Sequence, residues 1–201
     1  HTTAPRARVS YMATWYDGIG RQVASANYGT NGQEPLARPE TVPERSDDVL
    51  VTDALYNDRG ESYATVDPSG REDRTVFDDA GRVVETVENY VVLAGGEDPQ
   101  SDQNRTVRRT YTADGALATL TAVNPTTGNQ TTRYVYGTTV CDSFVARSDL
   151  LRAEIYPDSD DTSHLDDGAD QVYDRVEYTY YRDGAVKSKK DQNETVHAYT
   201  Y

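Results

Sequence analysis

The strongest constraint on this chain is a fixed spacing between aromatic residues, glycines and polar turn residues. Tyr56 is followed four residues later by Gly60 and then by an Asp-Pro-Ser-Gly turn at 67–70. The next aromatic with a glycine four residues after it, Phe77, lies 21 residues after Tyr56. The same spacing recurs near the C-terminal end in the order Tyr180, Gly184, Asp191 and Tyr201. Two separate segments with one spacing indicate a structural repeat, which has to be recognised before a fold is assigned.

Each repeat predicts a two-stranded β-hairpin. Val176, Tyr178 and Tyr180 alternate with polar residues, as in a strand that is buried on one face. The Asp or Asn after an aromatic predicts a tight turn, because its side chain bonds the local backbone and the following glycine accepts a positive φ. Such a hairpin is too small to be stable alone. The predicted fold is therefore all-β, an antiparallel meander of hairpins that pair side by side in an open or curled sheet.

The repeat positions are an aromatic residue, an aspartate, a glycine and, in the clearest copies, an arginine. These positions are Tyr16, Asp17, Gly20, Arg21, Tyr56, Gly60, Asp67, Gly70, Phe77, Asp78, Gly81, Arg82, Tyr111, Gly115, Tyr180, Gly184, Asp191 and Tyr201. In three copies Glu61, Ala116 or Ala185 replaces the arginine, and the copy at Tyr136-Gly137 is degenerate. We predict one repeat region over residues 1–201, with repeats that start near 16, 56, 77, 111, 136, 180 and 201.

Four insertions interrupt the repeats, at residues 30–48, 94–103, 140–152 and 156–171. Enrichment in Gly, Pro, Asp and Ser predicts loops for three of them, with one helical turn at 43–48 in the first. The third insertion is more apolar, which predicts an extra strand or a plug against the sheet. Insertions in repeat proteins tend to lie on one face, often the face toward partners, so specific recognition is expected in these loops.

The composition favours a thin sheet and disfavours anionic partners. Apolar residues make up 36% of the chain, and sixteen tyrosines stand against two phenylalanines and one tryptophan, so half-buried faces with hydrated hydroxyl groups are expected. The net charge of −14 opposes binding to nucleic acid. No apolar run approaches the roughly 20 residues of a membrane span, and the single cysteine, Cys141, cannot form an intramolecular disulfide.

Two sets of polar residues are candidate binding sites. Asp158, Asp160, Asp166 and Asp170 could supply oxygen ligands to calcium, although the spacing of an EF-hand loop is missing and a solvated acidic loop is the usual meaning of such a run. The repeated Asp and Arg could bind sugars beside tyrosine rings, or they could bond the turn and lie across neighbouring tyrosines. No other cofactor is expected. Because no catalytic motif is present, the chain is predicted not to be an enzyme.

The Tyr-Asp-x-x-Gly-Arg signature and its 21-residue step resemble the YD repeats of Rhs proteins, wall-associated bacterial proteins and teneurins. The clear copies cover residues 15–29, 52–90, 106–137 and 174–201, a little over half of the chain. The resemblance implies hairpins wound into a spiralling sheet that closes as a hollow shell. In bacterial toxin complexes and Rhs toxins such a shell encloses a C-terminal toxin domain, and in teneurins it forms a cell-surface barrel used in adhesion.

This resemblance implies a structural, non-catalytic segment of a large secreted or surface-displayed bacterial protein. Its partners would be the remainder of its own polypeptide and a C-terminal cargo domain. The alternative is an extracellular adhesion module whose insertion loops bind carbohydrate or a surface protein, and a hydrolase built on the same scaffold ranks below both. Because strands cut out of a larger sheet expose unpaired edges, the excised segment is also expected to self-associate.

Overall fold

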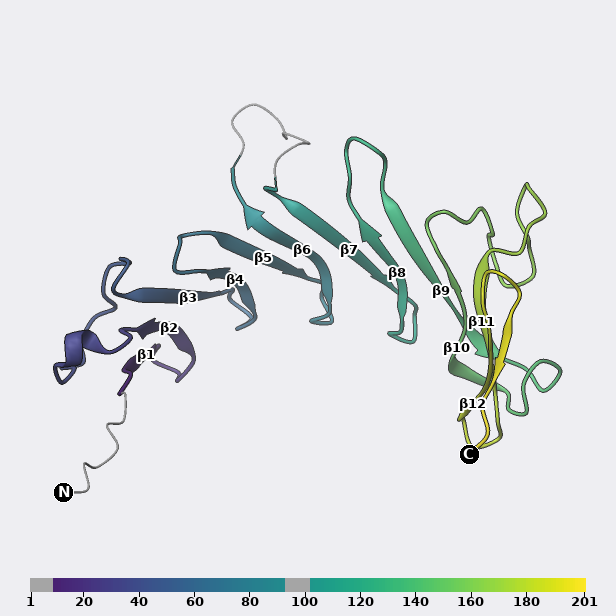
Figure 1. Ribbon diagram of the computed structural model, residues 1–201, viewed down its shortest axis with the longest axis horizontal. Coiled ribbons are helices and arrows are strands. Elements are labelled where there is room, and N and C mark those ends of the chain that lie inside the picture. Colours follow the sequence, from purple (N-terminus) through teal and green to yellow (C-terminus); the bar gives the residue numbers. More distant parts are fainter. Residues whose placement is uncertain (1–8, 93–101) are drawn as a thin grey trace, which may run out of the picture. The chain divides into compact units, whose positions relative to one another are not determined.

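The computed structural model describes residues 9–92 and 102–201 (Figure 1). The described residues form thirteen β-strands, and their only helical element is the short 3₁₀-helix η1 (Asn31–Gln33). The chain divides into two compact units, His1–Thr106 and Val107–Tyr201. The prediction of an all-β chain is confirmed.

In the first unit each strand pairs antiparallel with the next strand in the chain (Figure 1). The strands are β1 (Met12–Tyr16), β2 (Gln22–Asn27), β3 (Leu50–Tyr56), β4 (Ser62–Val66), β5 (Glu72–Phe77) and β6 (Val83–Tyr90). Within the described residues β1 has only β2 as a neighbour, so the sheet has an open edge there.

The second unit is built in the same way from β7, which begins at the boundary between the units. Its strands are β7 (Arg105–Tyr111), β8 (Leu117–Ala122), β9 (Gln130–Thr138), β10 (Arg147–Ile155), β11 (Arg175–Tyr180), β12 (Val186–Lys190) and β13 (Val196–Ala198). In the part of the chain that the structure describes, β13 pairs only with β12. The predicted antiparallel meander is therefore observed in both units.

The repeat aromatics mark the ends of alternate strands. Tyr16, Tyr56, Phe77, Tyr111 and Tyr180 are the last residues of β1, β3, β5, β7 and β11. The pairing register shifts immediately before each of these five residues. A bulge that recurs at one position bends and twists each hairpin in the same way, so the spacing in the sequence becomes a regular geometry in the sheet.

The buried core lies where long connections fold over the sheet. In the first unit it consists of Ala13, Trp15, Ala24, Ala26, Tyr28 and Val51, against which Leu36 and Val49 of the β2–β3 connection pack. In the second unit the buried apolar residues of β10, β11 and the segment between them are Ala153, Ile155, Tyr173, Val176 and Tyr180. Among the described residues of β4–β8, the buried hydrophobic residues are Ala64 and Val87. The central strands are accordingly half-buried on both faces.

The insertions differ in part from their predicted structures. The helical turn predicted at 43–48 is wrong, because Ser46 and Val49 exchange two backbone hydrogen bonds and close a tight loop that leads into β3. Of the insertion at 140–152, residues 147–152 lie in β10. The insertion at 94–103 lies outside the described residues except for its last two positions.

Candidate functional site

The turn that follows the repeat aromatic is organised by one carboxylate. Asp17 Oδ1 accepts the backbone N–H groups of Ile19 and Arg21 at 3.0 and 2.9 Å, and Arg21 Nε donates to Asp17 Oδ2 at 2.7 Å. Gly20, at φ +86°, donates its N–H to the Asp17 carbonyl oxygen. The same contacts recur in the turns that begin at Asp67 and Asp78. The same type of turn therefore connects the strands at both ends of the hairpins.

These hydrogen bonds stabilise the ionised form of the carboxylates. The backbone N–H of Arg21 and then its guanidinium lower the pKa of Asp17 below the ordinary value of 3.8. The Ser69 hydroxyl, followed by the backbone N–H of Arg71, lowers the pKa of Asp67 to about 2. Both carboxylates consequently stay ionised and keep their hydrogen bonds within the turns at neutral pH.

Neighbouring turns of the first unit also contact one another. The guanidinium carbon of Arg21 lies 4.4 Å from the centre of the Tyr56 ring in the next hairpin, and the Tyr56 hydroxyl donates to the Gln22 carbonyl oxygen at 2.9 Å. A Cβ atom on Gly60 would lie 3.3 Å from Arg21 Nη1. Gly60 is thus favoured both by its φ of +84° and by the close approach of the preceding turn.

Two departures from the repeat signature are accommodated within the turn. Where Glu61 replaces the arginine, Asn57 replaces the aspartate, and its Nδ2 donates to Glu61 Oε2 at 2.6 Å. In the turn with Ala116, the Thr112 hydroxyl accepts the Ala116 N–H at 3.1 Å. The side-chain acceptor is therefore kept even where the ion pair is lost. These contacts are those expected if the signature residues bond the turn, and their alternative role in sugar binding stays a prediction.

Other predicted repeat positions do not follow the arrangement of these turns. Tyr136 and Gly137 lie inside β9, and the chain turns only after Thr138. In the turn that begins at Asp191, Glu194 at φ +59° stands in the position that glycine occupies in other turns. Tyr201 lies outside the strands and is exposed.

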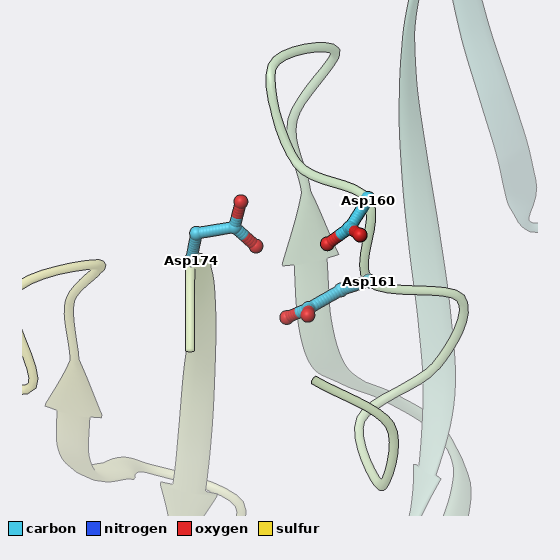
Figure 2. A group of neighbouring side chains, drawn as sticks. All are labelled: Asp160, Asp161 and Asp174. Carbon is cyan, nitrogen blue, oxygen red and sulfur yellow. The ribbon is translucent and has the colours of Figure 1, made fainter. Parts of the chain in front are cut away.

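A group of carboxylates lies in the connection between β10 and β11. Asp160 and Asp161 belong to this connection, and Asp174 immediately precedes β11, with its carboxylate turned toward the other two (Figure 2). One carboxylate oxygen from each residue lies within 4.8 Å of the others. Asp161 is fully buried, and its Oδ1 has no hydrogen-bond partner in the described part of the chain. Three acidic groups therefore converge, and one of them, Asp161, also has a buried oxygen without a hydrogen-bond partner in the described residues.

The buried Arg175 holds one side of this connection to the sheet. Its Nη1 donates to Asp161 Oδ2 at 2.6 Å and to Asp167 Oδ1 at 2.8 Å, and its Nε donates to Glu177 Oε1 at 2.7 Å. Its Nη2 donates to the His164 carbonyl oxygen at 3.1 Å. One guanidinium is consequently shared by three carboxylates.

Further hydrogen bonds hold the three aspartates in place. The Ser159 hydroxyl donates to Asp174 and accepts the Asp161 N–H at 3.1 Å, while Asp160 Oδ2 accepts the Ala169 N–H at 2.6 Å. Burial raises the pKa of Asp174, the Ser159 hydroxyl opposes this effect, and repulsion by Asp161 adds to it. The position of Asp174 thus disfavours its negative charge in the absence of a further cation.

Only one of the four predicted calcium ligands belongs to this carboxylate group. Asp160 is the member, whereas Asp158 is an exposed residue of the same connection. Asp166 and Asp170 use a side-chain oxygen in local turns, where they accept backbone N–H groups two residues later. The prediction therefore named the right connection and one of the three converging residues, and calcium binding itself stays a prediction.

A second feature is an open depression of about 660 Å³ in the second unit, whose lining includes aromatic residues. The ring centres of Phe144 and Tyr181 are 6.2 Å apart, and those of Tyr181 and Tyr201 are 6.4 Å apart in an edge-to-face arrangement. Arg182 and Asp183 also line it. Exposed rings beside charged groups are a surface on which a sugar could stack.

Among the comparisons with known proteins, only the search of solved structures gives matches. No family model matches the chain, and no curated protein matches it. Two solved structures that match are the crystal structures of TcdB2-TccC3-Cdc42 and TcdB2-TccC3, each at 14% identity with a TM-score of 0.40. Each match covers 87% of this chain but 9% of the other chain, so this chain spans a small part of their length. A likeness of this size does not extend to their activities or partners.

The described residues include no helix that is both long and apolar enough to cross a membrane.

Proposed function

We propose that this chain is a non-catalytic structural segment of a large secreted or cell-surface bacterial protein of the Rhs/YD-repeat type. In that protein it forms part of a shell that encloses or presents a C-terminal cargo domain. The observation that carries the proposal is one hairpin turn that recurs along the chain. In five hairpins a strand-ending aromatic is followed four residues later by a positive-φ glycine, and in four of them an Asp, Asn or Thr side chain accepts a backbone N–H of the turn. A binding site rarely recurs in every unit of a repeat protein, whereas the contacts that build the fold must recur.

The burial pattern supports the same role. Central strands that are half-buried on both faces suit a wall with water on each side, and tyrosine suits such a wall because its ring is apolar while its hydroxyl stays hydrated. The absence of catalysis is part of the proposal and rests on the lack of a catalytic motif in the sequence.

The test is protection of the cargo in the complete natural polypeptide that contains this repeat region. Under limited proteolysis, the region downstream of the repeats should persist in the wild-type protein. It should become sensitive in Gly81→Val, because a β-branched residue is disfavoured at φ +78° and opens the hairpin. If the downstream region is digested equally fast whether joined to the repeats or produced alone, the shell role is refuted.

The aromatic depression favours a second candidate, a module that binds carbohydrate. Its rings at Phe144, Tyr181 and Tyr201 and its neighbouring polar groups could stack against a sugar and bond its hydroxyls. A glycan array probed with this chain should then give a signal that Phe144→Ala abolishes. An array without any wild-type signal would exclude this candidate.

A further inference from the structure

We propose that Asp160, Asp161 and Asp174 bind one calcium ion, which fastens the β10–β11 connection to the start of β11 (Figure 2). Calcium–oxygen distances are 2.3–2.6 Å, so two oxygens on one ion lie at most about 5 Å apart. The three carboxylate oxygens all lie within 4.8 Å of one another. They are therefore close enough to share a single ion without rearrangement of the backbone.

A buried, unpartnered oxygen points to a ligand at this place. Asp161 is fully buried, its Oδ2 accepts a hydrogen bond from Arg175, and its Oδ1 has no partner in the described part of the chain. Burial of a charged oxygen without a partner is strongly unfavourable. A cation bound to Oδ1 would remove that penalty and leave the bond to Arg175 intact.

Around this group the carboxylates outnumber the cation that is bonded to them. The three carboxylates of the group are joined by Asp167 and Glu177, both of which pair with Arg175. Five carboxylates are thus accompanied by one bonded guanidinium. A divalent cation would offset much of the remaining negative charge.

The ligand chemistry selects calcium among the common divalent ions. The group offers carboxylate oxygens and contains neither histidine nor cysteine, the ligands that zinc prefers. Its members come from a loop and from the residue before a strand, an irregular arrangement that calcium accepts and that the strict octahedron of magnesium does not favour. Water would complete the coordination shell.

The backbone around Asp160 is adapted to hold its carboxylate at the group. A Cβ atom on Gly168 would collide with that carboxylate, and the Ala169 N–H donates to Asp160 Oδ2. Bound calcium would therefore link both ends of the connection that covers the buried residues of β10 and β11. This inference does not depend on the proposed shell role.

The test is titration of the full 201-residue chain with calcium after treatment with a chelator. Isothermal titration calorimetry should give one site with a dissociation constant of about 0.1–1 mM, the range of extracellular calcium modules. Asp174→Asn and Asp160→Asn should each weaken binding at least about tenfold, because each removes one charged ligand. Asp158→Asn, a matched loss of charge in the same connection but outside the group, should leave the affinity unchanged.

Thermal unfolding of the same variants, with and without calcium, shows whether each variant folds and whether calcium stabilises it. Calcium at one fixed concentration should raise the melting temperature of the wild type and of Asp158→Asn equally, and it should raise that of Asp174→Asn clearly less. The inference fails if the wild type shows no saturable binding up to about 10 mM calcium, well above the expected range. It also fails if Asp158→Asn loses as much affinity as Asp174→Asn, since calcium would then be attracted only by the overall charge of the loop.

Discussion

Substitution of Gly60 by alanine should destabilise the first unit through two separable effects. An L-residue in the left-handed region costs about 1–2 kcal/mol relative to glycine, and Gly60 has a φ of +84°. The added Cβ would also stand 3.3 Å from Arg21 Nη1, so the guanidinium must shift slightly from its place over the Tyr56 ring. Weakening of that cation–π contact adds at most about 0.5–1 kcal/mol at an exposed site.

Two other glycines of the first unit separate these effects. Gly20 has a φ of +86° and open space around the position that a Cβ atom would take, whereas Gly18 has the same open space without a positive φ. Gly18→Ala therefore reports only the smaller entropy of the unfolded chain, a gain of about 0.4–1 kcal/mol. Relative to Gly18→Ala, Gly20→Ala should lose about 1–2 kcal/mol, and Gly60→Ala should lose more than Gly20→Ala.

The assay is urea unfolding followed by the fluorescence of Trp15, the single tryptophan, which is buried in the first unit. In a unit of this size, each 1 kcal/mol lost should also lower the melting temperature by about 4–8 °C. In an Arg21→Ala background, the extra loss at Gly60 should disappear, because the crowding group is gone. Equal stability of the Gly18, Gly20 and Gly60 variants would refute the role of positive φ in the repeat turn.

The remaining predictions concern charge. Because the pKa of Asp67 is lowered to about 2, its bonds stabilise the fold above the ordinary value of 3.8 and are lost as pH falls from there toward 2. Acid titration followed by circular dichroism should therefore show a smaller loss of stability in Asp67→Asn than in the wild type, and an equal loss would contradict this. Arg175→Met should cost about 3–5 kcal/mol, since it leaves the buried Asp161 uncompensated. Arg147→Met, which breaks an exposed pair with Asp149, should leave the free energy of unfolding nearly unchanged. Because both arginines lie in the second unit, these two variants are compared by urea unfolding followed by circular dichroism.

The hairpins could be predicted from the sequence because their determinants are local. Asp17 bonds backbone groups two and four residues away, and Gly20 closes the turn within the same five residues. The spacing of residues in the sequence is therefore enough to predict these contacts. The rule fails at Tyr136, where Gly137 takes a φ of +100° inside β9 and the turn is delayed. Local spacing alone does not distinguish a glycine in a bulge from a glycine in a turn.

The carboxylate group could not be predicted in the same way because it depends on contacts across the connection. Asp174 is 13 residues from Asp161, and the two meet only because the connection folds back onto β11. The dense acidic run favoured Asp166 and Asp170 as ligands, but these residues accept local backbone N–H groups. The sequence feature that could have located the group is the pair Asp174-Arg175 at the start of a strand. The structure buries Arg175, and a buried arginine needs carboxylate partners.

The two kinds of contact have different consequences for the sheet. The repeat turns fix the register within each hairpin, but the strands that they join bury little apolar surface. Among the described parts of β4–β8, the buried hydrophobic residues are Ala64 and Val87. The connections after β2 and β10 supply what the turns lack, by placing Tyr28 and Tyr173 against the strands. Burial drives folding in proportion to apolar area, so stability should be concentrated where these connections lie. An ion that fastens the β10–β11 connection would accordingly act on one of the places where this thin sheet has a core.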